Sequence, residues 1–76
     1  MYYMYRCSYC RKLFYTYSNN RSQAARILYY GIKEHLQYYN EDHKEYQFDD
    51  HPSIEIRDMY KFMWMQDKKP AGGYPL

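Results

Sequence analysis

The stretch YRCSYCRKLF, residues 5–14, contains both cysteines of the 76-residue chain, Cys7 and Cys10. Two thiols separated by two residues are typical of metal sites and of redox pairs, and oxidation can join them as a disulfide. A tetrahedral zinc site needs four nitrogen or sulfur ligands, so Cys7 and Cys10 can supply only half of one. The rest of the sequence must therefore decide what holds these two thiols.

Length and composition favour a fold that is held together by more than its hydrophobic core. A chain of this size buries only about 60% of the surface that it exposes when unfolded. Tyrosine occurs 13 times and valine is absent, so much of the apolar surface belongs to rings whose hydroxyl groups need water or a partner. We expect one small domain with a shallow core that a bound metal would stabilise.

The sequence indicates a cytoplasmic or otherwise intracellular protein. It contains no run of about 18 apolar residues that could span a membrane, and its N-terminal segment MYYMYRCSYCRK lacks the apolar core of a signal peptide. Reducing conditions inside cells disfavour a structural disulfide, so metal or redox chemistry is indicated for the cysteine pair. A thioredoxin-like redox site needs a βαβ unit, for which this chain is too short.

The residues on either side of the cysteines predict a β-hairpin. Residues 2–6 are rich in tyrosine, and residues 13–17, LFYTY, are aromatic with a β-branched threonine, a composition typical of short strands. The cysteine pair lies in the turn between these two segments. Residues 18–20, SNN, then have the composition of a loop.

A long amphipathic helix is predicted to follow this loop. Asn20 or Ser22 can cap its first turn, and Gln23 has the spacing of a capping box relative to Asn20. Asn40 is a suitable end, because asparagine tolerates the left-handed conformation found at helix C-termini. At about 100° per residue, one broad face collects the residues expected to pack on the hairpin: Ala24, Ala25, Leu28, Ile32, His35, Leu36 and Tyr39.

The length of the helix predicts that His35 lies beside the cysteines. The strand that leaves Cys10 advances about 23 Å over about seven residues at about 3.3 Å each. The helix returns by about 20 Å between Ser22 and His35, at about 1.5 Å per residue. Because these lengths match, we expect His35 to be the third metal ligand; the alternative is a core histidine with other partners.

The fourth ligand is expected to be one of the two remaining histidines. His43 lies eight residues beyond His35, which is about 12 Å along an unbroken helix, so it reaches the same ion only if the helix ends near Asn40. His51 is the competing ligand, and an acidic ligand or a cysteine pair without metal are further alternatives. The expected site is one structural zinc ion bound by Cys7, Cys10, His35 and His43.

With these ligands the chain resembles the C2H2 zinc-finger superfamily over residues 5–43. CSYC followed by RKLF matches the C-x2-C-x3-F opening of such fingers, and IKEHL matches their apolar-x2-His approach to the third ligand. The resemblance implies a ββα fold around a structural zinc. The sequence departs from the family in having 24 residues between Cys10 and His35, which a longer hairpin and helix explain, and seven between His35 and His43. No base-reading code carries over.

The remaining sequence predicts a connector, a second helix and a tail. Residues 41–50, EDHKEYQFDD, form an acidic connector, after which Asp50 can cap a helix with Pro52 in its first turn. The helical stripe consists of Ile56, Met59, Tyr60 and Met63, and a strand over residues 53–57 is the alternative. Residues 67–76, DKKPAGGYPL, are expected to be a flexible tail. The predicted fold is therefore α+β: residues 1–66 form one zinc-stabilised domain, an elongated ββα finger followed by a second helix.

The charges are distributed unevenly along the chain. Residues 1–33 contain six bases and no acid, whereas residues 34–58 contain eight acids and two bases, within a net charge of +2. This asymmetry indicates either a surface that favours an anion or two halves that attract each other in the fold. Side chains suited to phosphates and bases form the candidate nucleic-acid surface, although a solvated helix face is the alternative: Arg11, Lys12, Gln23, Arg26, Tyr30, Lys33 and Gln37.

The sequence contains no feature of an enzyme. Four protein ligands would leave zinc without an open position for water, and no nucleophile–base pair stands out. We therefore expect a small regulatory zinc-binding protein whose partner is DNA or RNA, with no membrane partner and no small-molecule substrate. The rival hypothesis is a protein-interaction adaptor, or a homodimer, that uses the acidic middle and the cluster of Met59, Met63, Trp64 and Met65.

Overall fold

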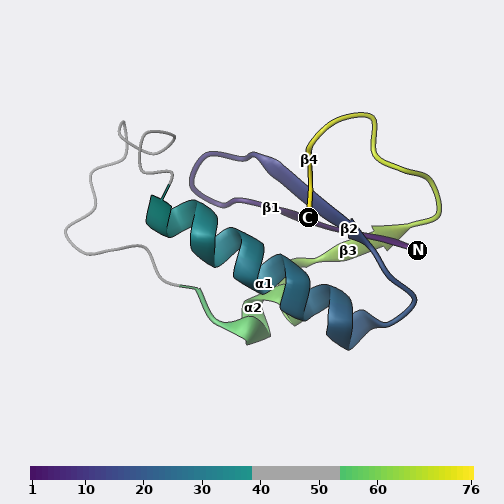
Figure 1. Ribbon diagram of the computed structural model, residues 1–76, viewed down its shortest axis with the longest axis horizontal. Coiled ribbons are helices and arrows are strands. Elements are labelled where there is room, and N and C mark those ends of the chain that lie inside the picture. Colours follow the sequence, from purple (N-terminus) through teal and green to yellow (C-terminus); the bar gives the residue numbers. More distant parts are fainter. Residues whose placement is uncertain (39–53) are drawn as a thin grey trace.

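The computed structural model describes residues 1–38 and 54–76 and has an α+β fold, as the sequence predicted (Figure 1). Its described elements are β1 (Tyr2–Arg6), β2 (Leu13–Tyr17), α1 (Arg21–Tyr38), α2 (Ile56–Phe62), β3 (Trp64–Gln66) and β4 (Tyr74–Pro75). The strands form one sheet in the order β3-β1-β2-β4. Both helices contribute to the hydrophobic core on one face of this sheet.

The predicted hairpin is confirmed with its expected bounds. β1 and β2 are antiparallel, with Tyr3 opposite Thr16 and Arg6 opposite Leu13. Residues 7–12 connect them, and we call this segment the cysteine loop. It is closed by hydrogen bonds from Cys7 N–H to the Lys12 carbonyl at 2.9 Å and from Arg11 N–H to the Cys7 carbonyl at 2.8 Å. These bonds hold the two cysteines in one tight turn.

The predicted first helix is also confirmed, and Asn20 is its cap. The Asn20 side chain accepts a hydrogen bond from Gln23 N–H at 3.1 Å, which satisfies one of the unpaired donors of the first turn. The Gln23 side chain does not complete a capping box on Asn20. It accepts instead from the Ser18 hydroxyl, which in turn accepts from Asn20 N–H. The predicted end at Asn40 lies outside the described residues.

The core lies between this helix and the hairpin. Alternate strand residues, including Tyr3, Tyr5 and Phe14, pack against the apolar face of α1. Leu28 and Ile32 on that face are 0% and 1% exposed, and burial of each such side chain contributes about 1.5–3 kcal/mol. The predicted face is buried as expected wherever it is described: Ala24, Ala25, Leu28, Ile32, His35 and Leu36.

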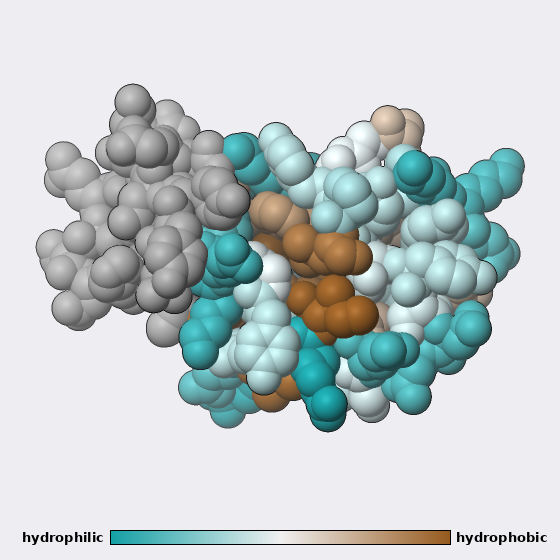
Figure 2. Space-filling model, in the orientation of Figure 1, coloured by the Kyte–Doolittle hydropathy of each residue, from teal (hydrophilic) through white to brown (hydrophobic). Residues whose placement is uncertain are grey.

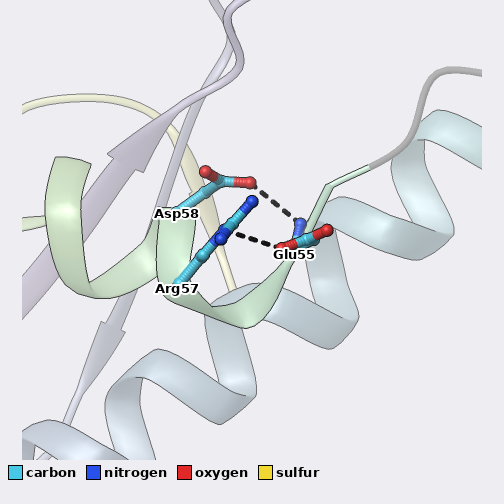
Figure 3. Close-up of polar contacts among 3 residues, drawn as sticks. All are labelled: Glu55, Arg57 and Asp58. Atoms are coloured by element: carbon cyan, nitrogen blue, oxygen red, sulfur yellow. Dashed lines mark hydrogen bonds and ion pairs between the residues drawn. The ribbon is translucent and has the colours of Figure 1, made fainter.

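The second helix is shorter than the sequence indicated. It begins at Ile56 rather than near Asp50, and Glu55 is its N-cap. The Glu55 N–H donates to the Asp58 carboxylate at 2.9 Å, and the Arg57 side chain pairs with Glu55 at 2.7 Å (Figure 3). Asp50 and Pro52 lie outside the described residues. The strand alternative for residues 53–57 is wrong at its end, because Ile56 is helical.

Trp64 and Met65, which the sequence placed at the end of the second helix, belong to β3 instead, so the helix prediction is wrong for these two residues. The backbone becomes extended at Met63, with φ −73° and ψ 149°, and β3 then pairs antiparallel with β1. Met59 and Met63 face the core, whereas Ile56 and Tyr60 are exposed. The residues after Met63 therefore pair with the edge of β1 instead of extending the helix and its apolar stripe.

The C-terminal residues that we predicted to be a flexible tail contribute β4 to the sheet. β4 pairs parallel with β2, and Leu76 N–H donates to the Tyr15 carbonyl at 2.8 Å. Proline is tolerated in an edge strand because one side of that strand has no partner strand. A Cβ at Gly31 of α1 would meet the Leu76 side chain first. The close approach of Leu76 to α1 therefore depends on the missing side chain at Gly31.

Candidate metal centre

The cysteine loop directs both thiols towards the core side of the hairpin. Cys7 is buried and Cys10 is half-buried, and both are reduced. Arg11 has a positive φ of 63°, a left-handed conformation that turns the chain back into β2. The Arg6 side chain donates to the Arg11 carbonyl at 2.9 Å, which holds that turn from outside. Local backbone geometry therefore fixes how far apart the cysteines lie.

His35 reaches the cysteines from α1, as the lengths of strand and helix predicted. Its side chain is 3% exposed, and its Nε2 lies 3.3 Å from the Cys10 Sγ. The imidazole packs against Phe14, with ring centroids 4.9 Å apart and planes inclined by 55°. This aromatic contact orients the ring, so a nitrogen atom faces the thiols.

The three side chains lie close enough together to bind a metal ion. The two sulfur atoms and one imidazole nitrogen all lie within 4.8 Å of one another. Tetrahedral zinc with Zn–S of about 2.3 Å and Zn–N of about 2.0 Å separates its ligands by about 3.5–3.8 Å. The spacing in the structure fits such an ion after small movements of the side chains. Two sulfur ligands and one nitrogen ligand are a donor set that zinc accepts.

The electrostatic environment of Cys10 differs from that of a redox cysteine. Burial raises the pKa of its thiol and the neighbouring Cys7 raises it further, although the Lys12 backbone N–H acts in the opposite direction. Reactive cysteines depend on a lowered pKa, because the thiolate is the nucleophile. A bound divalent cation would reverse the balance by stabilising the thiolate. The raised pKa therefore argues against a reactive thiol at Cys10, and a metal ion that binds there would displace the thiol proton.

The predicted fourth ligand is a histidine from the segment that follows α1 in the sequence. His43 and its competitor His51 both lie outside the described residues. Within residues 1–38 and 54–76, the group consists of Cys7, Cys10 and His35, and no other histidine, cysteine or acidic side chain joins it as a fourth ligand. The assignment of His43 therefore stays a prediction from the sequence.

The predicted nucleic-acid residues lie on the surface wherever their side chains are described. Gln23, Arg26, Tyr30 and Lys33 are exposed on α1, and Tyr30 is 61% exposed. Arg11 is exposed in the cysteine loop. Lys12 is half-buried and its Nζ lies 5.5 Å from the centre of the Tyr74 ring, and the Gln37 side chain is outside the described part. Exposure agrees with a binding surface and equally with a solvated face.

Two residues near the candidate metal centre were missed by sequence reasoning. Tyr74 packs against Phe14 with ring centroids 5.5 Å apart, and it lines a cavity of about 300 Å³ together with Leu76 and His35. Leu76 is 43% exposed. The face of the molecule drawn in Figure 2 has an apolar area near its middle. The sequence did not indicate that residues 67–76 contribute to the surroundings of His35, because their proline and glycine residues are also typical of a disordered tail.

Comparison of the chain with protein-family models, with curated proteins and with solved structures finds no match. Its zinc-finger resemblance therefore rests on the residues quoted above. Among the described helices, none is long and apolar enough to cross a membrane. The fold and the site together define a small α+β protein with a candidate Cys–Cys–His metal centre.

Proposed function

We propose that this chain is a small, non-enzymatic zinc-binding protein in which zinc has a structural role. The observation that carries the proposal is the convergence of Cys7, Cys10 and His35, whose ligand atoms lie within 4.8 Å of one another. The fourth ligand is His43, with His51 as the alternative. One ion bound in this way would join the cysteine loop to α1 across 25 positions of sequence.

Two physical arguments support a structural rather than a catalytic ion. Four protein ligands leave no coordination position for a reacting water molecule. In addition, the core is small and rich in tyrosine, so the free energy of zinc binding would add substantially to the free energy of folding. The zinc-finger resemblance of residues 5–43 points to the same role.

Elemental analysis of the purified protein, with thermal melts in the presence and absence of a chelator, tests this proposal. We expect one zinc per chain and a large fall in melting temperature on chelation. Cys7→Ser should bind no zinc, and its melting temperature should not respond to the chelator. Ser8→Ala changes the exposed residue next to Cys7 and should keep the zinc and the response to the chelator. A metal-free protein with an unchanged melt in chelator would refute the zinc site.

The same measurements assign the fourth ligand. His43→Ala should lower zinc content and melting temperature, and His51→Ala should change neither. The reverse result would make His51 the ligand. Wild-type zinc content in both variants would leave neither histidine as the ligand and would contradict the proposed four-ligand site.

We further propose that the partner of this protein is a nucleic acid and that its role is regulatory. Support comes from the acid-free first 33 residues and from exposed Arg11, Arg26 and Lys33. Binding should weaken steeply with salt, because each neutralised phosphate releases counterions. Arg26→Ala with Lys33→Ala should reduce the slope of log K against log salt by about 2. The matched control is Lys68→Ala with Lys69→Ala, which makes the same charge change outside the candidate nucleic-acid surface.

A protein-interaction adaptor is the second candidate function, and one observation favours it. Phe62, Trp64 and Met65 are 56%, 42% and 56% exposed. A partner that contacts them would meet an apolar surface of the kind that often marks an interaction site. Binding through that surface would depend little on salt. Salt-insensitive association that Met65→Ala weakens, together with no affinity for nucleic acid, would favour the adaptor.

A further inference from the structure

A cavity lies between the cysteine loop, α1, α2 and β3. Its volume of about 410 Å³ is near the lower end of the range of about 300–1,000 Å³ that is typical of small-ligand sites. Besides Cys7 of the cysteine loop, four aromatic rings and two charged side chains line it: Tyr5, Tyr9, Phe62, Trp64, Arg6 and Asp58.

The aromatic rings of the cavity differ in their exposure. Tyr5 is only 6% exposed and belongs to the core. Phe62 and Trp64 line the same cavity but are 56% and 42% exposed, so each offers ring surface to a ligand that enters from solvent. Exposed rings around a concave site are the means by which proteins stack the bases of single-stranded nucleic acids.

The charged groups at the cavity suit a nucleotide. Arg6 is exposed, and its bond to the Arg11 carbonyl keeps its guanidinium beside the cysteine loop, in the part of the chain that has no acids. Asp58 accepts the Glu55 N–H at 2.9 Å (Figure 3), and a carboxylate has further lone pairs for a second donor. The site therefore combines a cation, exposed aromatic rings and a hydrogen-bond acceptor.

We propose that this cavity binds a base of single-stranded nucleic acid, a proposal that rests on the nucleic-acid part of the proposed function. The base stacks on Trp64 and Phe62, and Arg6 contacts the adjoining phosphate. Asp58 accepts a hydrogen bond from an exocyclic amino group, as acidic side chains do from the N4 amino group of cytosine. A base paired within a duplex cannot enter a cavity of this kind, so the site selects single strands.

The chain provides its own reporter for this site, because Trp64 is the single tryptophan. The probes are single-stranded oligomers of eight cytidines and of eight uridines, and an abasic ribose-phosphate oligomer of the same length. Cytosine and uracil have the same size but differ in an amino group against a carbonyl oxygen. We expect the cytidine oligomer to quench Trp64 fluorescence and bind more tightly than the uridine oligomer, and the abasic oligomer to cause no quenching.

Substitutions on the exposed rings test the stacking directly, with affinities measured by the anisotropy of labelled oligomers. Trp64→Ala and Phe62→Ala should each weaken binding of the cytidine oligomer by about 5- to 150-fold. Trp64→Phe keeps a ring and should retain most of the affinity. Asp58→Asn should remove the preference for cytidine over uridine. Thermal melts and zinc content confirm that each variant folds.

The outcomes separate this proposal from the function on which it rests. If oligomers bind with steep salt dependence while Trp64 fluorescence and the ring variants stay unchanged, the cavity proposal is overturned and nucleic-acid binding stands. If no single strand or duplex binds, both fall. If Trp64 emission shifts with protein concentration alone, a second copy of the chain occupies this surface, which also overturns the proposal.

Discussion

Replacing His35 by phenylalanine separates the two roles that this side chain has in our proposal, metal binding and packing. His35 is 3% exposed and its ring centre lies 4.9 Å from that of Phe14. Phenylalanine keeps a ring of similar size in this contact but has no nitrogen atom. Volume-conserving changes in a core usually cost less than about 1.5 kcal/mol. In the presence of a chelator, His35→Phe should therefore unfold within about that energy of the wild type.

The effect of zinc on the two proteins should differ strongly. At a free zinc concentration 100 times the dissociation constant, binding stabilises the native state by about 2.7 kcal/mol. For a domain of this size each kcal/mol shifts the melting temperature by about 4–8 °C, so zinc should raise the wild-type value by about 11–22 °C relative to chelator. His35→Phe loses one of the ligands and should lose most of this increment.

Four thermal melts, of each protein with zinc and with chelator, measure both quantities by circular dichroism. Leu36→Met is the matched control, because Leu36 is also 3% exposed and is adjacent to the ligand without being one. It should alter the melting temperature equally in both conditions and keep the zinc increment. The reasoning is refuted if His35→Phe keeps the wild-type increment, because zinc binding would then not involve His35.

Three further changes test local structure through the free energy of unfolding in urea. Asn20→Ala removes the acceptor of Gln23 N–H and should cost about 1 kcal/mol; no loss would contradict the cap. Arg11→Gly relieves a φ of 63° and should stabilise by up to about 1 kcal/mol, whereas a loss would show that the arginine side chain contributes to folding. Gly31→Ala places a methyl group against Leu76, so its effect should be more favourable by about 1 kcal/mol in a Leu76→Ala background. Equal effects in both backgrounds would contradict that contact.

The hairpin, α1 and the three candidate metal ligands could be predicted because local rules determine them. Tyrosine-rich segments on both sides of a tight turn define the two strands, and the spacing from Ala24 to Leu36 defines the buried face of the helix. The position of His35 could be predicted from the lengths of β2 and α1, because a strand and a helix of similar length bring His35 back to Cys10. Each of these inferences depends on regular geometry within one or two neighbouring elements.

The C-terminal half was less predictable because its strands depend on partners far away in the sequence. Trp64–Gln66 has three residues, too few for a period to be recognised, and becomes a strand by pairing with β1. Tyr74–Pro75 has two residues in a segment rich in glycine and proline, and its position follows from pairing with β2. Tertiary context decides the structure of such short segments, which overrides their local preferences.

The cysteine loop links the proposed zinc site to the proposed base-binding cavity. Cys7 is 1% exposed and is both a candidate ligand and part of the wall of the 410 Å³ cavity. The preceding residue, Arg6, is the cation proposed to contact phosphate, and it is held by the carbonyl of Arg11 in the same loop. A metal ion bound to Cys7 and Cys10 would therefore fix the loop that forms one side of the cavity. Zinc would then act on nucleic-acid binding through the order that it gives this loop, without contacting the nucleic acid.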